Sequence, residues 1–290
     1  MVCFFLNDIF NTLCGNSPLE DMNSIFYDEV LAYNYDYFLV KIYGDFKKNN
    51  PNLVYSKFEE GIFSYNLIMN YNRMNILLCI RKIMKLPVPK ESAFYCFFPE
   101  AYEGNLIAKR IPPIIDDVLE VKEILEIGFG IDKAKFLNQY SEKYIFFTSV
   151  YDFEGESPIG EFEAICEIAK LVGKENLLIK KHPRDSRMIF EEHGFKVDSN
   201  SSIPWEALQF EINLNGKTLL TVNSGAVIST SLLFGSNVKS VYVYNICQYE
   251  SNSLAVASIK NIDSLIKSDF FKDRVPNVYK IDKVEDLVNK

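Results

Sequence analysis

The chain is poor in the residues that build metal sites and disulfide frameworks. It has only two histidines, His182 and His193, and its six cysteines are scattered singly with no Cys-x-x-Cys pair. Neither histidine lies at ligand spacing from a cysteine, which disfavours a zinc site. The cysteines lie mostly inside apolar runs, so we expect buried thiols in a reducing compartment.

Other shortages exclude whole classes of protein. Thirteen glycines and eleven prolines are too few for a fibrous or low-complexity chain. No stretch approaches the roughly 20 apolar residues of a membrane-spanning helix, and the apolar opening at residues 1–10 lacks the basic flank of a signal peptide. A net charge of −8 argues against a nucleic-acid partner. We expect a cytoplasmic protein, which could also touch the inner face of the membrane.

Length and composition indicate two domains. The 290 residues exceed the usual size of one domain, and 48% hydrophobic residues can build full cores. In the first half, short apolar runs that end in polar residues predict strands, and a longer run predicts a helix over 64–85. Pro112 and Pro113 interrupt any helix around them. The expected strands lie within 2–9, 29–35, 52–61 and 93–104.

The second half alternates strands and helices more regularly. Strands are expected within 143–150, 175–183, 194–198, 217–224 and 239–245, with helices over 161–173, 184–194, 204–213 and 225–235. Such alternation implies parallel strand–helix–strand units, and nearly continuous apolar strands imply a sheet covered on both faces. We therefore predict an α/β fold with domains 1–138 and 139–290, the second a Rossmann-like open sheet.

Polar residues cluster where these strands end, which is where ligands bind in open parallel sheets. Four groups stand out: Glu59, Glu60 and Gly61; Asp152, Glu154 and Glu156; His182, Pro183, Arg184 and Asp185; and Asn223 and Ser224 with Ser229, Thr230 and Ser231. The third group is the most informative, because Lys180, Lys181 and Arg184 surround the imidazole with positive charge that suits a phosphate. A protonated His182 could donate to a departing phosphate oxygen. The alternative is a structural histidine that caps a helix.

The sequence resembles the bacterial sialyltransferases of glycosyltransferase family 52, and more loosely the related bacterial polysialyltransferases. The resemblance rests on four short motifs that follow one another in a compatible order and lie at strand ends. They are Phe58 to Gly61 with Ser64 and Tyr65, Ile179 to Asp185, Ser202 to Glu206, and Ser229 with Thr230.

The resemblance implies a GT-B fold, in which two Rossmann-like domains with mostly parallel sheets face a cleft. It implies CMP-sialic acid as donor and a galactose-terminated glycan of a capsular polysaccharide or lipooligosaccharide as acceptor. It also implies inversion of the anomeric centre, with no metal or other cofactor. The sequence has no convincing Asp-x-Asp at a strand end, which agrees with transfer that needs no metal.

Without a metal, side chains and helix N-termini would neutralise the departing CMP. The resemblance assigns the leaving phosphate to His182, as general acid or hydrogen-bond donor. Ser229 and Thr230, near a helix start, would donate to the same phosphate. Glu206, also at a helix start, would accept from the cytidine ribose or base, or is an ordinary first-turn carboxylate. The other expected substrate-binding residues are Gly61, Lys180, Pro183, Arg184, Pro204 and Ser224.

The general base stays open between two groups of carboxylates. Glu59 and Glu60 resemble the acidic pair before a glycine that supplies the base in several bacterial sialyltransferase families. The second group precedes the His182 motif and consists of Asp152, Glu154, Glu156 and Glu161. A solvated loop is the ordinary explanation of that second group.

The chain departs from family 52 in starting late, so the N-terminal sheet could lack its first strand. An uncovered edge strand invites association, which makes a homodimer reasonable. The last helix could pack back on the first domain. Two other functions stay open, namely glycerophosphate transfer from CDP-glycerol to a wall polymer and a non-catalytic scaffold in capsule assembly.

Overall fold

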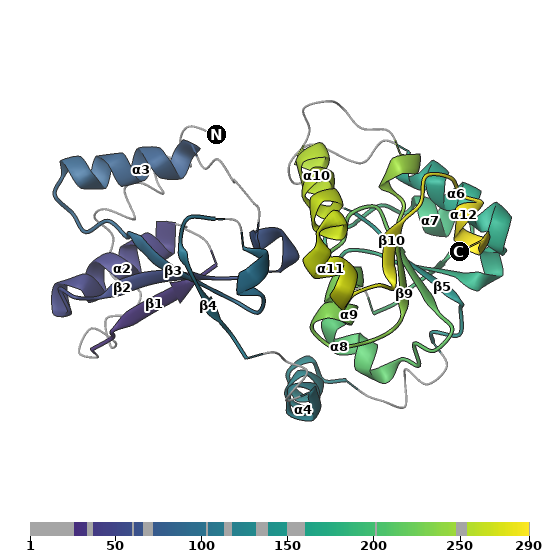
Figure 1. Cartoon of the computed structure of the whole chain (residues 1–290), viewed down its shortest axis with the longest axis horizontal. Coiled ribbons are helices and arrows are strands. Elements are labelled where there is room, and N and C mark those ends of the chain that lie inside the picture. The colour runs from purple at the N-terminus through teal and green to yellow at the C-terminus, as the bar shows by residue number, and fades with distance from the viewer. Residues whose placement is uncertain are drawn as a thin grey trace. The chain divides into compact units, whose positions relative to one another are not determined.

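The computed structural model describes ten segments of the chain, which are residues 26–33, 37–59, 61–65, 72–102, 104–112, 118–131, 139–149, 160–200, 202–247 and 254–289. The chain divides into two compact units, each built around its own sheet (Figure 1). Unit 1 consists of Met1–Glu60 and Ser64–Pro112, and unit 2 of Gly61–Phe63 and Pro113–Lys290.

Unit 1 contains a four-stranded sheet in which every neighbouring pair is parallel. Its strands lie in chain order: β1 (Glu29–Ala32), β2 (Val54–Phe58), β3 (Glu91–Cys96) and β4 (Ile107–Arg110). The helix α2 (Tyr37–Asn49) connects β1 to β2. The segment between β2 and β3 contains the 3-10 turn η2 (Ile62–Tyr65) and α3 (Asn72–Ile83), and η3 (Pro99–Ala101) follows β3.

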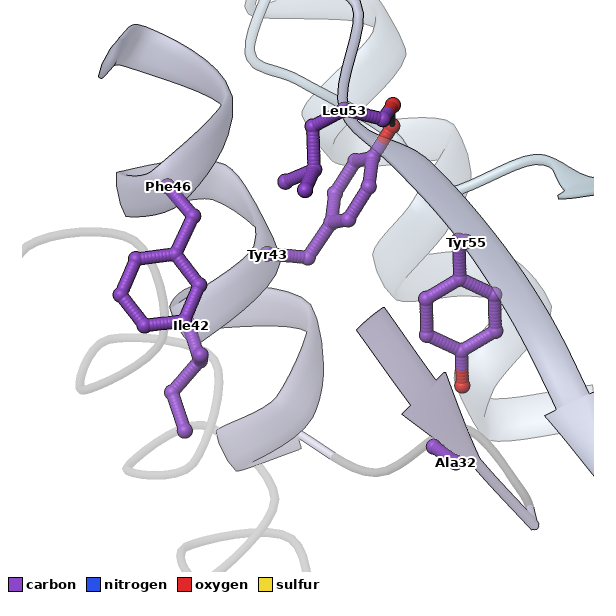
Figure 2. Close-up of a cluster of buried hydrophobic side chains, with 6 residues drawn as sticks. All are labelled: Ala32, Ile42, Tyr43, Phe46, Leu53 and Tyr55. Atoms are coloured by element: carbon purple, nitrogen blue, oxygen red, sulfur yellow. Dashed lines mark hydrogen bonds between the residues drawn. The ribbon is translucent and has the colours of Figure 1, made fainter. Parts of the chain in front are cut away.

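A cluster of side chains that are at most 8% exposed joins α2 to the first two strands: Ala32, Ile42, Tyr43, Phe46, Leu53 and Tyr55. In Figure 2, Tyr43 points toward Leu53, and Tyr55 points toward Ala32. The rings of Tyr43 and Tyr55 meet edge to face, with their centroids 5.9 Å apart. This packing fixes β2 against α2 and thereby fixes the strand end at which Glu59 lies.

Unit 2 contains a six-stranded parallel sheet in the spatial order β10-β9-β8-β5-β6-β7. The strands are β5 (Tyr144–Phe147), β6 (Leu177–Lys180), β7 (Lys196–Val197), β8 (Thr218–Thr221), β9 (Lys239–Tyr242) and β10 (Val278–Lys280). Every residue of β5, β6 and β8 is buried. Such burial is expected for a parallel sheet that is covered on both faces.

The helices of unit 2 lie mostly between successive strands. They are α4 (Val118–Phe129), α6 (Glu161–Val172), α7 (Ile189–Glu192), α8 (Trp205–Leu208), α9 (Ala226–Leu232), α10 (Leu254–Lys267), α11 (Asp269–Arg274) and α12 (Asp286–Asn289). Three 3-10 turns complete the unit: η6 (Lys174–Asn176), η7 (Gln209–Glu211) and η8 (Tyr244–Ile246). No helix in the described segments combines the length and the hydrophobicity that crossing a bilayer requires.

The expected fold class, α/β with parallel sheets, is confirmed. All five strands expected in the second half are present, but the helix expected over 184–194 is confined to α7. The short edge strands β4 and β10 are additional to the strands expected from the sequence. The strand expected within residues 2–9, and with it the question of a missing first strand, lies outside the described residues.

The compact units divide the chain after Pro112, whereas the predicted domain boundary lies at 138. The segment in dispute contains α4, which contacts α8. The ammonium group of Lys122 on α4 donates to the carbonyl of Phe210 (3.2 Å) and pairs with Glu211 (3.0 Å). These contacts attach α4 to unit 2. The boundary at 138 and the packing of the last helix on the first domain stay predictions.

Candidate active site

The carboxyl edge of the unit 2 sheet has a topological switch point between β5 and β8. From β5 the chain runs outward through β6 and β7 and then returns to β8 on the other side of β5. Ligands of open parallel sheets bind at such points. Ser149, just after β5, donates a 2.6 Å hydrogen bond from Oγ to Oδ1 of Asn223, just after β8. These two side chains bridge the strand ends at the switch point.

His182 lies at the same edge, in the loop that follows β6. Its Nδ1 accepts a 3.2 Å hydrogen bond from the backbone N–H of Arg184. A ring nitrogen that accepts cannot carry the proton of the neutral imidazole, so that proton lies on Nε2. Partial burial, together with the positive charge of Arg184, lowers the pKa of His182 below its ordinary value of 6.5. At neutral pH the ring is therefore an uncharged donor through Nε2.

The two lysines before His182 are buried and bind protein groups. Lys180 pairs with Asp198 at 2.9 Å, and Lys181 pairs with Glu191 at 3.0 Å. The ammonium of Lys180 also donates to two backbone carbonyls at 3.3 Å, and that of Lys181 to one at 2.7 Å. Both lysines therefore stabilise neighbouring loops through these contacts. Arg184 differs from them in being exposed.

The His182 loop also contains Arg187, a partly buried residue that could not be singled out from the sequence and that lies between two buried carboxylates. Its Nη2 lies 2.7 Å from Oδ2 of Asp185 and 2.9 Å from Oε2 of Glu161. The other oxygen of Glu161 accepts from the backbone N–H of Ser149 at 2.8 Å. Burial raises the pKa of Glu161 to about 7, although Arg187 opposes this shift. Both oxygens of this base candidate are thus bound to protein donors.

Glu206 and Ser229 come together on neighbouring helices. α8 contacts α9, and Oγ of Ser229 donates to Oε1 of Glu206 over 3.2 Å. Both side chains are partly exposed, so a ligand can reach them. Thr230 has a different environment, because it is fully buried and its Oγ1 accepts from Nε1 of Trp205 at 2.6 Å. Thr230 therefore holds α8 against α9.

The remaining predicted substrate-binding residues of the sheet edge lie around these groups. Pro183 is exposed beside His182, and Pro204 directly precedes α8. Ser224 is partly exposed, and its Oγ accepts from the N–H of Ala226 at the start of α9 (3.3 Å). The structure thus brings the His182 loop, the switch point and the start of α9 to one edge of unit 2.

Of the two base candidates in unit 1, Glu59 lies within the described residues. It follows β2, and its Oε2 accepts from the phenol of Tyr65 and from the backbone N–H of Phe97, the latter at 2.8 Å. Burial raises the pKa of Glu59, even though these hydrogen bonds favour the charged form. Such a carboxylate is a stronger base than an exposed one.

Several predicted residues lie outside the described residues, namely Glu60, Asp152, Glu154 and Glu156. Gly61 is described and partly exposed, directly before η2. Among the described segments, no three His, Cys, Asp or Glu side chains are grouped as a metal ion requires. The expected independence from metals stays a prediction.

The family model of the alpha-2,8-polysialyltransferases matches residues 13–244, which is more than half of the chain. The chain belongs to this family. The expectation of a glycosyltransferase is thereby confirmed, as is its assignment to the sialyltransferases. Membership of glycosyltransferase family 52 in particular stays a prediction. No curated protein sequence matches the chain.

Solved structures give a fold for this family member. The chain is similar to the alpha/beta-galactoside alpha-2,3-sialyltransferase of the luminous marine bacterium Photobacterium phosphoreum, with a TM-score of 0.51 and 13% identity over 92% of this chain and 81% of that one. This similarity supports a GT-B-like arrangement of each sheet and its helices. The chain is also similar to S. aureus MnaA in its structure with UDP, at a TM-score of 0.45 and 10% identity over 99% of this chain and 80% of that one, which is too weak to carry an inference.

Proposed function

We propose that this protein transfers sialic acid from CMP-sialic acid to a glycan acceptor, with inversion and without a bound metal. The observation that carries the proposal is the neutral imidazole of His182, which presents an Nε2–H donor at the carboxyl edge of a nucleotide-type sheet. The family membership supports the same transfer. Within the sialyltransferases, the order and spacing of the four motifs favour family 52.

The departing phosphate of CMP is the group that His182 serves. A donor aimed at developing negative charge stabilises the transition state more than the ground state. The neutral state of the ring favours a hydrogen bond from Nε2–H over full proton transfer from an imidazolium. Arg184, exposed next to the ring, supplies positive charge at the same place. Ser224 offers a hydroxyl donor from the neighbouring strand end, and Ser229 offers one when its O–H turns from Glu206 to the phosphate.

Glu206 is the proposed acceptor for the cytidine part of the donor. Its Oε1 already accepts from Ser229, and a carboxylate has room for further hydrogen bonds at each oxygen. The two hydroxyls of a ribose, or an amino group of the base, match such an acceptor. Because Ser229 has a single O–H, it would donate either to Glu206 or to the phosphate.

For the general base we favour Glu59 or Glu60 over Glu161. Glu161 is 1% exposed and both of its oxygens are occupied by Arg187 and Ser149. Glu59 is partly exposed, and its pKa is raised. A base must reach the acceptor hydroxyl directly, which burial in an ion pair prevents. Asp152 and Glu154 stay candidates.

Two acceptors fit the proposal. The sequence motifs point to a galactoside-type acceptor of a capsular polysaccharide or lipooligosaccharide. The family name points to an acceptor that itself ends in sialic acid. A homodimer, contact with the inner face of the membrane and a cytoplasmic location also stay predictions.

A panel of radiolabelled donors and defined acceptors tests the proposal. We expect label transfer from CMP-sialic acid to a galactose-terminated or a sialic acid-terminated oligosaccharide, and none from CDP-glycerol. Transfer from CDP-glycerol alone would replace the proposal with the wall-polymer function. Calorimetry with CMP tests the scaffold function, because failure to bind CMP together with inactivity toward both donors would indicate a non-catalytic protein.

A further inference from the structure

Thr148 lies directly after β5 and is 3% exposed, yet it makes two hydrogen bonds to the His182 loop. Its Oγ1 accepts from the backbone N–H of His182 at 3.1 Å and donates to Oδ2 of Asp185 at 2.7 Å. A hydroxyl can accept one hydrogen bond and donate another at the same time. Thr148 thus ties both His182 and Asp185 to the end of the neighbouring strand.

We propose that Thr148 and Asp185 are positioning residues that hold His182 in the orientation and tautomer in which Nε2–H is the donor. The inference rests on the proposed function in so far as it concerns the reaction. It assigns no contact with substrate to either residue. Both act through the imidazole.

Asp185 is the fixed end of this arrangement. It is 6% exposed and accepts from three donors of Arg187: the backbone N–H (3.1 Å), Nε (2.8 Å) and Nη2 (2.7 Å). Burial opposes its charge, but the hydrogen bonds from Arg187 and Thr148 outweigh burial and hold the pKa of Asp185 below its ordinary 3.8. The carboxylate is therefore ionised throughout the neutral range. Its own N–H donates back to the carbonyl of His182 at 2.8 Å, which closes the turn.

Arg187 extends the same support to the switch point. Its Nη2 donates to the backbone carbonyl of Ser149 at 3.1 Å and to Glu161 at the start of α6. Ser149 in turn bonds to Asn223 beyond β8. The ends of β5, β6 and β8 and the first residue of α6 are thus joined by side-chain hydrogen bonds.

Residues 181–188 form neither a helix nor a strand, so hydrogen bonds from side chains such as Thr148, Lys181 and Arg187 hold the loop in place. The bond from the Arg184 N–H to Nδ1 of His182 exists only while the backbone of both residues stays in place. Loss of the Thr148 hydroxyl would remove its hydrogen bonds to the His182 N–H and to Asp185, which would then be held by Arg187 alone. A displacement of about 1 Å at a catalytic group can cost roughly 100-fold in rate.

The two-histidine composition permits a direct test of tautomer and orientation. Protein labelled with 15N-histidine gives ring signals from His182 and His193 alone, and His193→Gln assigns them. In the unsubstituted protein at neutral pH we expect Nδ1 of His182 to show the shift of an unprotonated acceptor and Nε2 that of a protonated donor. In Thr148→Val, which keeps the shape of the side chain and removes the hydroxyl, the two shifts should move toward each other. Thr148→Ser, which keeps the hydroxyl, should restore them.

Turnover provides the second measurement. We expect Thr148→Val to lower kcat by about 10- to 100-fold with a smaller change in KM for the donor, and Thr148→Ser to stay within about threefold of the parent. Unchanged His182 ring shifts together with unchanged kcat in Thr148→Val would overturn the inference. Loss of kcat in Thr148→Ser as large as in Thr148→Val would also count against it, because the hydroxyl would then be irrelevant.

The ring signals separate this inference from the proposed function, since they need no substrate. If the parent protein transfers no sialic acid but Thr148→Val still scrambles the His182 tautomer, the positioning role holds and the proposed function fails. If Thr148→Val does not fold, as judged by circular dichroism, Asp185→Asn repeats the test. It keeps the shape of the carboxylate and removes its charge, and unchanged ring shifts in that variant would refute the proposal.

Discussion

The backbone N–H of Arg184 donates to Nδ1 of His182 over 3.2 Å. The residue two positions along the chain therefore sets the tautomer of the imidazole, and the same residue places a positive charge beside it. Both effects favour the neutral ring, one through a hydrogen bond that needs an unprotonated Nδ1 and the other through charge repulsion. The first two predictions follow from this relationship.

His182→Ala should lower kcat by about 100- to 10,000-fold, the range usual for loss of a positioned proton donor. The matched control is His193→Ala, because His193 is exposed and its ring lies against Phe162, away from the carboxyl edge. Transfer of radiolabelled sialic acid measures both variants. A loss below about threefold in His182→Ala would remove the imidazole from the reaction.

His182 should titrate below its ordinary pKa of 6.5, because burial and Arg184 both disfavour the charged ring. On acidification the unfolded chain then takes up this proton before the folded protein does, so the contribution of His182 to stability falls as the pH drops through that window. Activity should accordingly stay level on the acid side until below 6.5. Titration of the His182 ring signal by NMR checks the midpoint, and a midpoint above 6.5 would contradict the neutral-donor role.

Glu206→Gln should weaken CMP binding by about 10- to 100-fold, which is the usual cost of losing hydrogen bonds to a charged group. Isothermal calorimetry measures this affinity without turnover. Glu163→Gln is the matched control, since Glu163 is also a first-turn carboxylate, on α6, and is exposed. Equal CMP affinity in the two variants would show that Glu206 does not bind the nucleotide and is an ordinary first-turn carboxylate.

Glu161 should make the stability of the protein depend on pH in the neutral range. Its pKa is raised to about 7 in the folded protein and is 4.5 ordinarily, so the folded state binds more protons between these values. The contribution of Glu161 to the free energy of unfolding is complete below pH 4.5. It is lost as the pH rises through about 7, a decrease of about 3 kcal/mol in all. Urea unfolding measures the free energy of unfolding at about pH 5 and about pH 8. The difference between these two values should be smaller in Glu161→Gln, which cannot ionise, than in the parent protein. An identical pH dependence in the variant would show that Glu161 does not titrate there.

Glu59→Gln should reduce kcat by about 100-fold or more if this carboxylate is the base, while leaving CMP affinity unchanged. Glu100→Gln, which changes an exposed carboxylate of the same unit, is the control. Full activity in Glu59→Gln would exclude Glu59 as the base. The corresponding amide substitutions at Glu60, Asp152 and Glu154 would then be measured in turn.

The fold of unit 2 could be predicted because its strands are short apolar runs separated by helices. β5, β6 and β8 are buried at every position, so each appears in the sequence as a short, mostly apolar run. β4 ends in Lys109 and Arg110, both exposed at the edge of its sheet, and such an edge strand has no apolar pattern to reveal it.

The site could be predicted in part, because ligands bind where parallel strands end. That rule led to His182, Ser224 and the group around Ser229. It could not reveal that Lys180 is buried against Asp198, because a lysine beside a histidine has the same sequence signature whether it binds a phosphate or a carboxylate. Arg187 was missed for a similar reason, since Glu161 reaches the Arg187–Asp185 pair only when β5 and β6 are paired.

The chain contains one tryptophan. Trp205 is 3% exposed, meets the ring of Phe147 edge to face, and is bonded through its indole nitrogen to Thr230. It immediately precedes Glu206, the residue proposed to bind the cytidine part of the donor. Tryptophan fluorescence, which can be excited selectively beside the 17 tyrosines, therefore has a single origin, and it can report whether CMP binds without an attached dye.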